Sequence, residues 1–171
     1  LKAGKIAAEA IKYAESLIKG RYKRNLYEIC ELIEEKIVSL GGLPAFPCNI
    51  DVNEVAAHFS PYPTDTVNLP DNGIVKVDLG VRINGYIVDT AVSVALSEEY
   101  EDITKYAKKA LEKAVQAMRP GTKSGEIGGI IEDVAKEGGF KTIKNLSGHL
   151  IKEYNLHAGK SIPNTRTLLS H

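Results

Sequence analysis

The sequence has no tryptophan, one methionine, two cysteines and no excess of either charge. The cysteines, Cys30 and Cys48, are too few for a disulfide scaffold and lack metal-ligand spacing, which predicts reduced thiols in a cytosolic protein. The 22 basic residues balance the 22 acidic ones, so net charge favours neither nucleic acid nor an anionic membrane as a partner. No apolar run approaches the length of a membrane span, and we expect no signal peptide. These absences predict a cytoplasmic protein without membrane or nucleic-acid partners.

What the sequence does contain is apolar periodicity. Its 171 residues fit one domain with a hydrophobic core. Apolar residues recur at helical spacing over residues 3–19, 26–40, 97–118 and 124–137. Residues 43–70 hold five prolines instead and are typical of short strands and loops. A β-hairpin lies between the proline-rich stretch and the last two helices. We expect the helices at 97–118 and 124–137 to cover its apolar face, which gives an α+β fold.

That hairpin is the stretch from Gly73 to Ala95, which alternates along two arms that meet at Asn84-Gly85. Asn-Gly is the strongest two-residue hairpin signal, because a type I′ turn needs positive φ at both central residues. Pairing through this turn makes Asp78 and Asp89 diagonal neighbours on the polar face. Diagonal residues lie about 7–8 Å apart at Cα, close enough for two carboxylates to bind one cation. Gly80, opposite Asp89, clears space beside it; the alternative is an ordinary solvated face.

Three of the four histidines lie in two stretches rich in glycine and alanine. His58 follows two alanines, so we expect it to be partly buried, while His149 and His157 stand eight residues apart. Each histidine alone is more typical of a hydrogen-bonded structural residue. Together with the paired aspartates, however, they favour a carboxylate–imidazole site for Mn, Fe, Co or Zn. Such a site acidifies a bound water and polarises a carbonyl, which predicts hydrolysis.

The motifs around these residues resemble those of the methionine aminopeptidases, a family with the pita-bread (creatinase/aminopeptidase) fold. In chain order they are Val77-Asp78-Leu79-Gly80, residues 85–91 (Gly-Tyr-Ile-Val-Asp-Thr-Ala) and Gly148-His149. Residues 56–61 and His157-Ala158-Gly159-Lys160 are similar to the type II branch of archaea and eukaryotes. The resemblance covers essentially the whole chain. It implies a curved antiparallel sheet covered by helices, with residues 1–171 as the N-terminal part, about the first half, of one metallo-aminopeptidase catalytic domain.

The resemblance also implies roles for single residues. Two divalent metal ions would be bound, with Asp78 chelating one, Asp89 bridging both and His149 binding the other. His58 and His157 would act as catalytic and substrate-binding residues that donate hydrogen bonds to the scissile carbonyl.

Phe46 and Leu156 would line the apolar pocket for a methionine side chain, and Cys48 lies near that pocket in the sequence. The substrate would be a peptide or nascent protein that begins with methionine followed by a small residue. The full-length protein would be a cytoplasmic monomer that removes the initiator methionine during protein maturation.

The sequence departs from the family pattern at its C-terminal side. Two glutamates complete the dinuclear site in the family, but after His149 the sequence has only Glu153, which matches neither position, and the type II helical insertion is missing. We therefore expect residues 1–171 alone to bind metal weakly and to hydrolyse nothing. Two alternatives stay open: another pita-bread peptidase, such as an Xaa-Pro type, and a binding module without catalysis. The three retained metal ligands favour an enzyme over the module.

Overall fold

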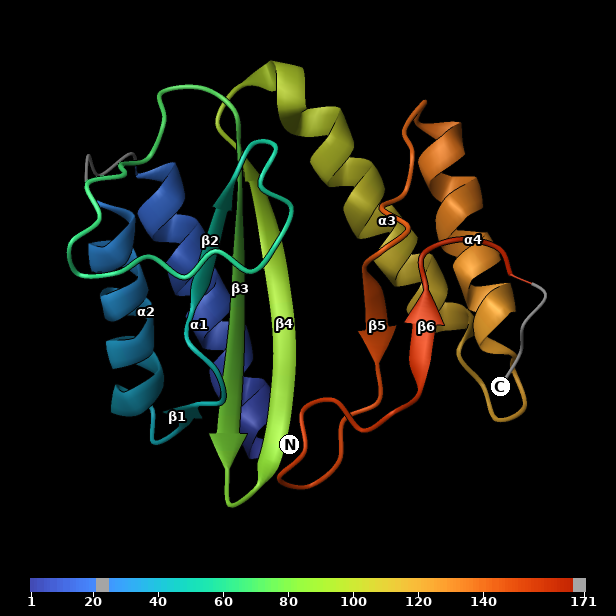
Figure 1. Cartoon of the computed structure of the whole chain (residues 1–171), viewed down its shortest axis with the longest axis horizontal. Helices are drawn as coiled ribbons and strands as arrows, with labels where there is room; N and C mark the ends of the chain where they lie inside the picture. Colours follow the sequence, from blue (N-terminus) through green and yellow to red (C-terminus); the bar gives the residue numbers. More distant parts are fainter. Residues whose placement is uncertain (21–24, 168–171) are drawn as a thin grey trace. The chain divides into compact units, whose positions relative to one another are not determined.

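A computed structural model describes residues 1–20 and 25–167 (Figure 1). The chain forms two compact units, and each is described by itself. Unit 1 comprises Leu1–Tyr100 and Lys152–Leu156, and unit 2 comprises Glu101–Ile151 and the described residues from His157 onward. Within the described ranges, no helix is both long enough and apolar enough to span a membrane.

Unit 1 is built on an antiparallel sheet whose central strand is β3 (Ile74–Ile83) (Figure 1). β4 (Tyr86–Ala95) pairs with the whole length of β3 on one side. The short strands β1 (Leu43–Pro44) and β2 (Asn49–Val52) pair with successive parts of β3 on the other. The prediction of short strands and loops in the proline-rich stretch is thus confirmed.

The β3–β4 hairpin has the register that its Asn-Gly turn predicts. Val81 faces Val88, and Ile83 faces Tyr86 across the turn. Asn84 has φ 47° and Gly85 has φ 83°, as a type I′ turn requires. One face of the hairpin is therefore apolar, and its buried residues are Val75, Val77, Leu79, Val81 and Val94.

The helix α1 (Lys2–Lys19) covers this apolar face, and α2 (Leu26–Ser39) packs beside α1 and against β1 and β2 (Figure 1). Their buried side chains form one core with those of β2, β3 and β4, and each fully buried isoleucine or leucine contributes about 1.5–3 kcal/mol. We predicted instead that the helices at 97–118 and 124–137 would cover the hairpin. That prediction is wrong, because α1 already covers the face. The α1 residues on it are mostly alanines, which let the helix lie close to the sheet: Ala3, Ala7, Ala10 and Ala14.

The 3₁₀ turn η1 (Glu98–Tyr100) ends the first part of unit 1. In unit 2, α3 (Glu101–Ala117) packs on α4 (Ser124–Glu137), and α4 also packs on β6 (Ser161–Pro163). β6 pairs in antiparallel fashion with β5 (Ser147–His149). Unit 2 therefore fixes the strand that ends at His149.

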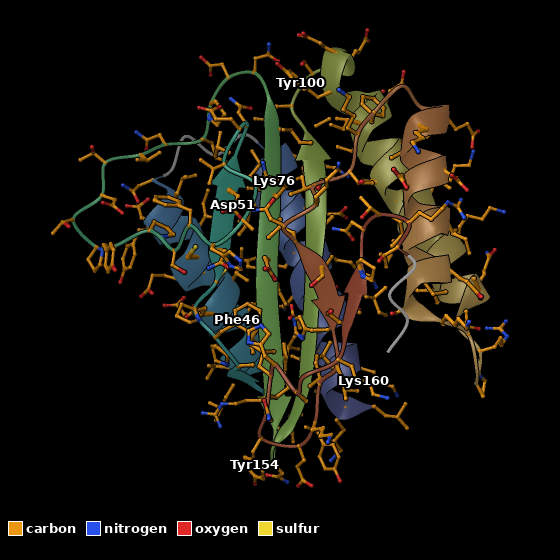
Figure 2. All side chains as sticks on the ribbon, turned by 45° about the vertical axis from the view of Figure 1, so that its right-hand side comes forward. Phe46, Asp51, Lys76, Tyr100, Tyr154 and Lys160 are labelled. Carbon is orange, nitrogen blue, oxygen red and sulfur yellow. The ribbon has the colours of Figure 1, made fainter. Side chains whose placement is uncertain are left out.

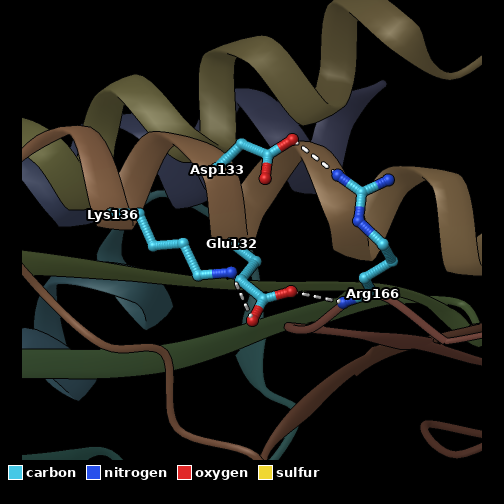
Figure 3. Close-up of polar contacts among 4 residues, drawn as sticks. All are labelled: Glu132, Asp133, Lys136 and Arg166. Carbon is cyan, nitrogen blue, oxygen red and sulfur yellow. Dashed lines mark hydrogen bonds and ion pairs between the residues drawn. The ribbon is translucent and has the colours of Figure 1, made fainter.

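One ion pair and one backbone hydrogen bond join the chain after β6 to α4, and a further ion pair lies within α4 (Figure 3). The backbone N–H of Arg166 donates to Glu132 Oε2 at 3.0 Å, and its Nη2 donates to Asp133 Oδ2 at 2.6 Å. Lys136 Nζ lies 3.0 Å from Glu132 Oε1. Exposed ion pairs contribute about 1 kcal/mol or less each. We therefore expect close packing to contribute most of the stability of the contact between α4 and the chain after β6.

Gly128 of α4 provides that close packing. A Cβ at this position would lie 2.7 Å from the carbonyl oxygen of Pro163 and closer still to that of Thr165. Alanine normally stabilises a helix by about 1 kcal/mol relative to glycine. We nevertheless expect Gly128→Ala to lower the free energy of unfolding by about 1–3 kcal/mol, because a backbone cannot give way as a flexible side chain does.

Gly4 is the matched control, since it lies in α1 with no neighbouring atom within 4 Å of the position of a Cβ. Gly4→Ala should raise the free energy of unfolding by up to about 1 kcal/mol. Urea denaturation measures both variants. Equal stability of the two would contradict the close packing between α4 and the segment after β6.

Candidate active site

Asp78 and Asp89 lie on the polar face of the β3–β4 hairpin in unit 1. Asp78 pairs with Ala91 and Asp89 pairs with Gly80, so the two aspartates are diagonal neighbours, as the sequence predicted. Both are half-buried. Burial raises the pKa of Asp78 to about 6, and the neighbouring Asp89 carboxylate acts in the same direction.

One oxygen of the Asp78 carboxylate, Oδ1, is buried without a hydrogen-bond donor. No group among the described residues forms a hydrogen bond with it. A buried oxygen without a donor costs free energy, and two adjacent carboxylates repel each other. A divalent cation would remove both costs, because carboxylate oxygens are good ligands for it. The hairpin therefore fits one wall of a metal centre.

The structure brings His149 and His157 together in unit 2. Their ring centroids lie 4.4 Å apart, with an angle of 59° between the ring planes. The chain between them turns back on itself, because Ala158 N donates to Leu150 O at 2.8 Å. His149 is half-buried and His157 is exposed. The sequence placed both histidines in the site but gave no sign of this contact.

The described residues thus hold two pairs, Asp78 with Asp89 in unit 1 and His149 with His157 in unit 2. Within residues 1–20 and 25–167, no three His, Cys, Asp or Glu side chains are grouped so as to hold a metal ion. The assignment of Asp78, Asp89 and His149 to one metal centre stays a prediction.

Phe46 covers Gly80 on the polar face of the sheet, and Figure 2 shows it beside the strands. The chain approaches there because Ala45 N donates to Gly80 O at 3.0 Å. A Cβ on Gly80 would lie 2.6 Å from Phe46 Cδ1 and 2.9 Å from Ala45 Cβ. We predicted that Gly80 clears space beside Asp89. The structure shows that the cleared space holds an aromatic ring, which forms an apolar wall next to the aspartates.

Gly80→Ala should therefore lower the free energy of unfolding by about 1–3 kcal/mol, because the added methyl group clashes with the ring of Phe46. Phe46→Ala removes the ring but leaves Ala45 Cβ 2.9 Å from the added methyl group, so the same glycine substitution should cost less in that background without becoming free of cost. A double-mutant cycle by urea denaturation measures the difference. An equal cost in both backgrounds would show that the ring is not what requires glycine.

His58 is exposed, which corrects the expectation of partial burial. Of the two alanines before it, Ala56 is exposed and Ala57 is half-buried, so they lie in a surface segment and not in a packed core. His58 has φ 70°, a left-handed backbone that is uncommon for a residue other than glycine. Burial raises the pKa of Asp78, and the charge of His58 opposes that rise. His58 therefore acts electrostatically on Asp78.

Leu156, the other residue predicted to line the methionine pocket, lies in unit 1. Leu156 is half-buried, and its segment of unit 1 reaches the hairpin tip, where Tyr154 N donates to Gly85 O at 2.8 Å (Figure 2). Cys48 is a core residue, only 3% exposed, with its carbonyl accepting a hydrogen bond from Cys30 Sγ at 3.4 Å. Cys30, expected in the core, is buried there.

Sequence reasoning missed two buried polar residues on β2, Asn49 and Asp51, which are 8% and 1% exposed. The alternation Asn49-Ile50-Asp51-Val52 is a strand signal, but the surrounding prolines obscured it. Burial raises the pKa of Asp51, and a hydrogen bond from the backbone of Phe59 opposes the rise. Such a residue needs a partner that justifies its burial.

Comparison with known proteins identifies the class of protein. The model of metallopeptidase family M24 matches residues 1–170. The chain therefore belongs to metallopeptidase family M24.

Within metallopeptidase family M24, the relatives place the chain among the methionine aminopeptidases of archaeal type. The chain is 48% identical over 164 residues to a methionine aminopeptidase from Thermococcus onnurineus. This alignment covers 96% of this chain and 55% of that protein. It is 42% identical over 184 residues to a methionine aminopeptidase from Methanothermus fervidus, with 99% and 96% covered. The chain thus spans about half the length of most curated relatives that it matches.

Solved structures confirm the predicted pita-bread fold. A methionine aminopeptidase from Thermotoga maritima superposes with a TM-score of 0.86 at 26% identity, covering 97% of this chain and 69% of that one. A prolidase from Pyrococcus furiosus superposes with a TM-score of 0.81 at 24% identity, covering 98% and 50%. The second likeness shows the fold alone.

Proposed function

We propose that this chain is the N-terminal part of the catalytic domain of an enzyme that removes N-terminal methionine from peptides and nascent proteins with a small second residue. The observation that carries the proposal is the half-buried aspartate pair, with a carboxylate oxygen of Asp78 left without a donor. In this proposal the whole enzyme is a cytoplasmic monomer that binds neither membrane nor nucleic acid.

Two divalent metal ions, from Co, Mn, Fe or Zn, complete the site in this proposal. Asp78 would chelate one ion, Asp89 would bridge both and His149 would bind the other. When bound, the ions supply Lewis-acid chemistry, which acidifies a water and polarises the scissile carbonyl. Hard carboxylates together with an imidazole suit these metals.

The remaining residues bind and orient the substrate. His58 and His157 donate hydrogen bonds to the scissile carbonyl as negative charge develops on its oxygen. Phe46 and Leu156 line the pocket for the methionine side chain. Burying that side chain is worth about 1.5–3 kcal/mol, which would favour methionine over a smaller first residue.

The substrate is tested on the full-length protein with Met-Ala and Xaa-Pro peptides. We expect release of methionine from the first and no cleavage of the second. The opposite preference would identify another pita-bread peptidase. Cleavage of neither peptide, without metal uptake, would identify a binding module.

Residues 1–171 alone should release no methionine from a Met-Ala peptide. The two glutamate ligands that complete the site in the family have no match in this sequence. Mass spectrometry of the peptide after overnight incubation with Co²⁺ or Mn²⁺ measures this. Robust release by this polypeptide would contradict the proposed ligand set.

A further inference from the structure

The two buried polar side chains of β2 hold the segment that follows His58. Asp51 Oδ1 accepts a hydrogen bond from Phe59 N at 2.9 Å. Asn49 Nδ2 donates to Ser60 Oγ at 2.6 Å, and this hydroxyl donates to the carbonyl of Cys48 at 3.2 Å. Phe59 and Ser60 are therefore hydrogen-bonded to two side chains of β2. The burial of these two polar side chains has no explanation in hydrophobic packing alone.

Phe59 is fixed on both of its backbone polar groups. Its N–H donates to Asp51, and its carbonyl accepts from Ile50 N at 3.0 Å. Its ring packs against the hydrophobic core of unit 1. The residue directly after His58 thus has little freedom to move.

The side chain of His58 is exposed, so its own packing does little to hold it in place. Its left-handed backbone, at φ 70°, costs about 1–3 kcal/mol and persists only where the surroundings impose it. Because His58 is exposed, packing of its own side chain does not impose that conformation. The anchor at Phe59 is the constraint closest to it in the chain.

Asp51 does not serve mainly as an ion-pair partner. Lys76 lies opposite it across the β2–β3 pair, and Figure 2 shows both side chains on the sheet. The Lys76 ammonium, however, donates to Asn53 O at 2.7 Å. The carboxylate of Asp51, 1% exposed, is instead directed to the backbone of Phe59.

We propose that Asp51 is a positioning residue of the active site, which fixes the backbone at His58 through the Phe59 N–H and so aims the imidazole. The inference rests on the role proposed above for His58. It assigns Asp51 no contact with substrate or metal.

The test uses Asp51→Ala and the conservative Asp51→Asn, which keeps an acceptor oxygen, in the full-length protein with isotope-labelled histidine. We expect kcat on a Met-Ala peptide to fall about ten- to a hundredfold in Asp51→Ala with KM nearly unchanged, and to recover in Asp51→Asn. The His58 imidazole resonances, assigned by their loss in His58→Gln, should move toward those of free histidine only in Asp51→Ala. The resonances of His149 and His157 should stay in place.

The outcomes separate this inference from the proposed function. A folded Asp51→Ala protein with unchanged His58 resonances overturns the inference. Moved resonances with full activity in both Asp51→Ala and His58→Gln support the positioning and refute the catalytic role of His58. If Asp51→Ala does not fold, Asp51→Leu keeps the branched shape of the side chain without an acceptor and is read in the same way. Rapid hydrogen exchange at the Phe59 amide of the unsubstituted protein would also overturn the inference.

Discussion

Replacing Asp89 by asparagine should weaken the binding of Mn²⁺ or Co²⁺ to this chain by about 100-fold or more. Loss of a residue that only supports a ligand already costs about 10–100-fold in metal affinity, and Asp89 is proposed as a ligand of both ions. The amide keeps the shape of the side chain but removes the charge that attracts the cation. Isothermal titration calorimetry at pH 7.5 measures the change.

Asp71→Asn is the matched control, because Asp71 is an exposed aspartate just before β3 in the same unit. Its loss should leave the affinity unchanged within about twofold, since an exposed charge outside the site is largely screened. Metal uptake that survives Asp89→Asn would contradict the role of the hairpin and would revive the binding module.

Replacing Asp78 by asparagine should stabilise the metal-free chain at neutral pH. The folded state raises the pKa of this carboxyl from 3.8 to about 6, through burial and the neighbouring Asp89. The folded chain therefore holds a proton more tightly than the unfolded chain, and stability falls as pH rises through this window. Ionisation costs the native state up to about 3 kcal/mol above pH 6, and Asp78→Asn avoids that cost.

Urea denaturation in EDTA at pH 4, 5, 6 and 7 measures the effect. The stability advantage of Asp78→Asn over the unsubstituted chain should be small at pH 4 and grow up to pH 7. With Mn²⁺ at about 100 times its dissociation constant, the unsubstituted chain should gain about 2.7 kcal/mol and the variant almost nothing. An advantage that does not change with pH would show that Asp78 ionises as it does in the unfolded chain.

The hairpin could be predicted because its determinants are local. Asn84 and Gly85 specify the turn, and alternation from that point assigns each residue to a face. The diagonal placement of Asp78 and Asp89 followed directly. The family motifs then gave these residues roles that geometry alone does not supply.

The helices that cover the hairpin could not be predicted in the same way. Apolar periodicity shows that a helix has a face to bury but does not say what that face packs against. The small alanine face of α1 matched the sheet, while α3 and α4 packed on each other. The helices at 97–118 and 124–137 follow the hairpin directly in the chain, and this order led to the wrong prediction.

The hydrogen bond between Asp51 and Phe59, next to His58, could not be predicted from the sequence either. Asp51 and Phe59 are eight residues apart, and only the return of the chain to β2 brings the carboxylate to the amide. The left-handed backbone at His58, which we propose depends on that return, has no signature in the neighbouring alanines. The pairing of Phe46 with Gly80 is similarly a contact between distant segments.

The central claim is that Asp78, Asp89 and His149 bind the same metal centre. Substoichiometric Mn²⁺ added to the ¹⁵N-labelled chain tests it most directly, because this paramagnetic ion broadens the amide signals of the residues near it. We expect the amides of all three residues to broaden together, while those around Gly4 stay sharp. Broadening at the hairpin aspartates with a sharp His149 signal would contradict the claim.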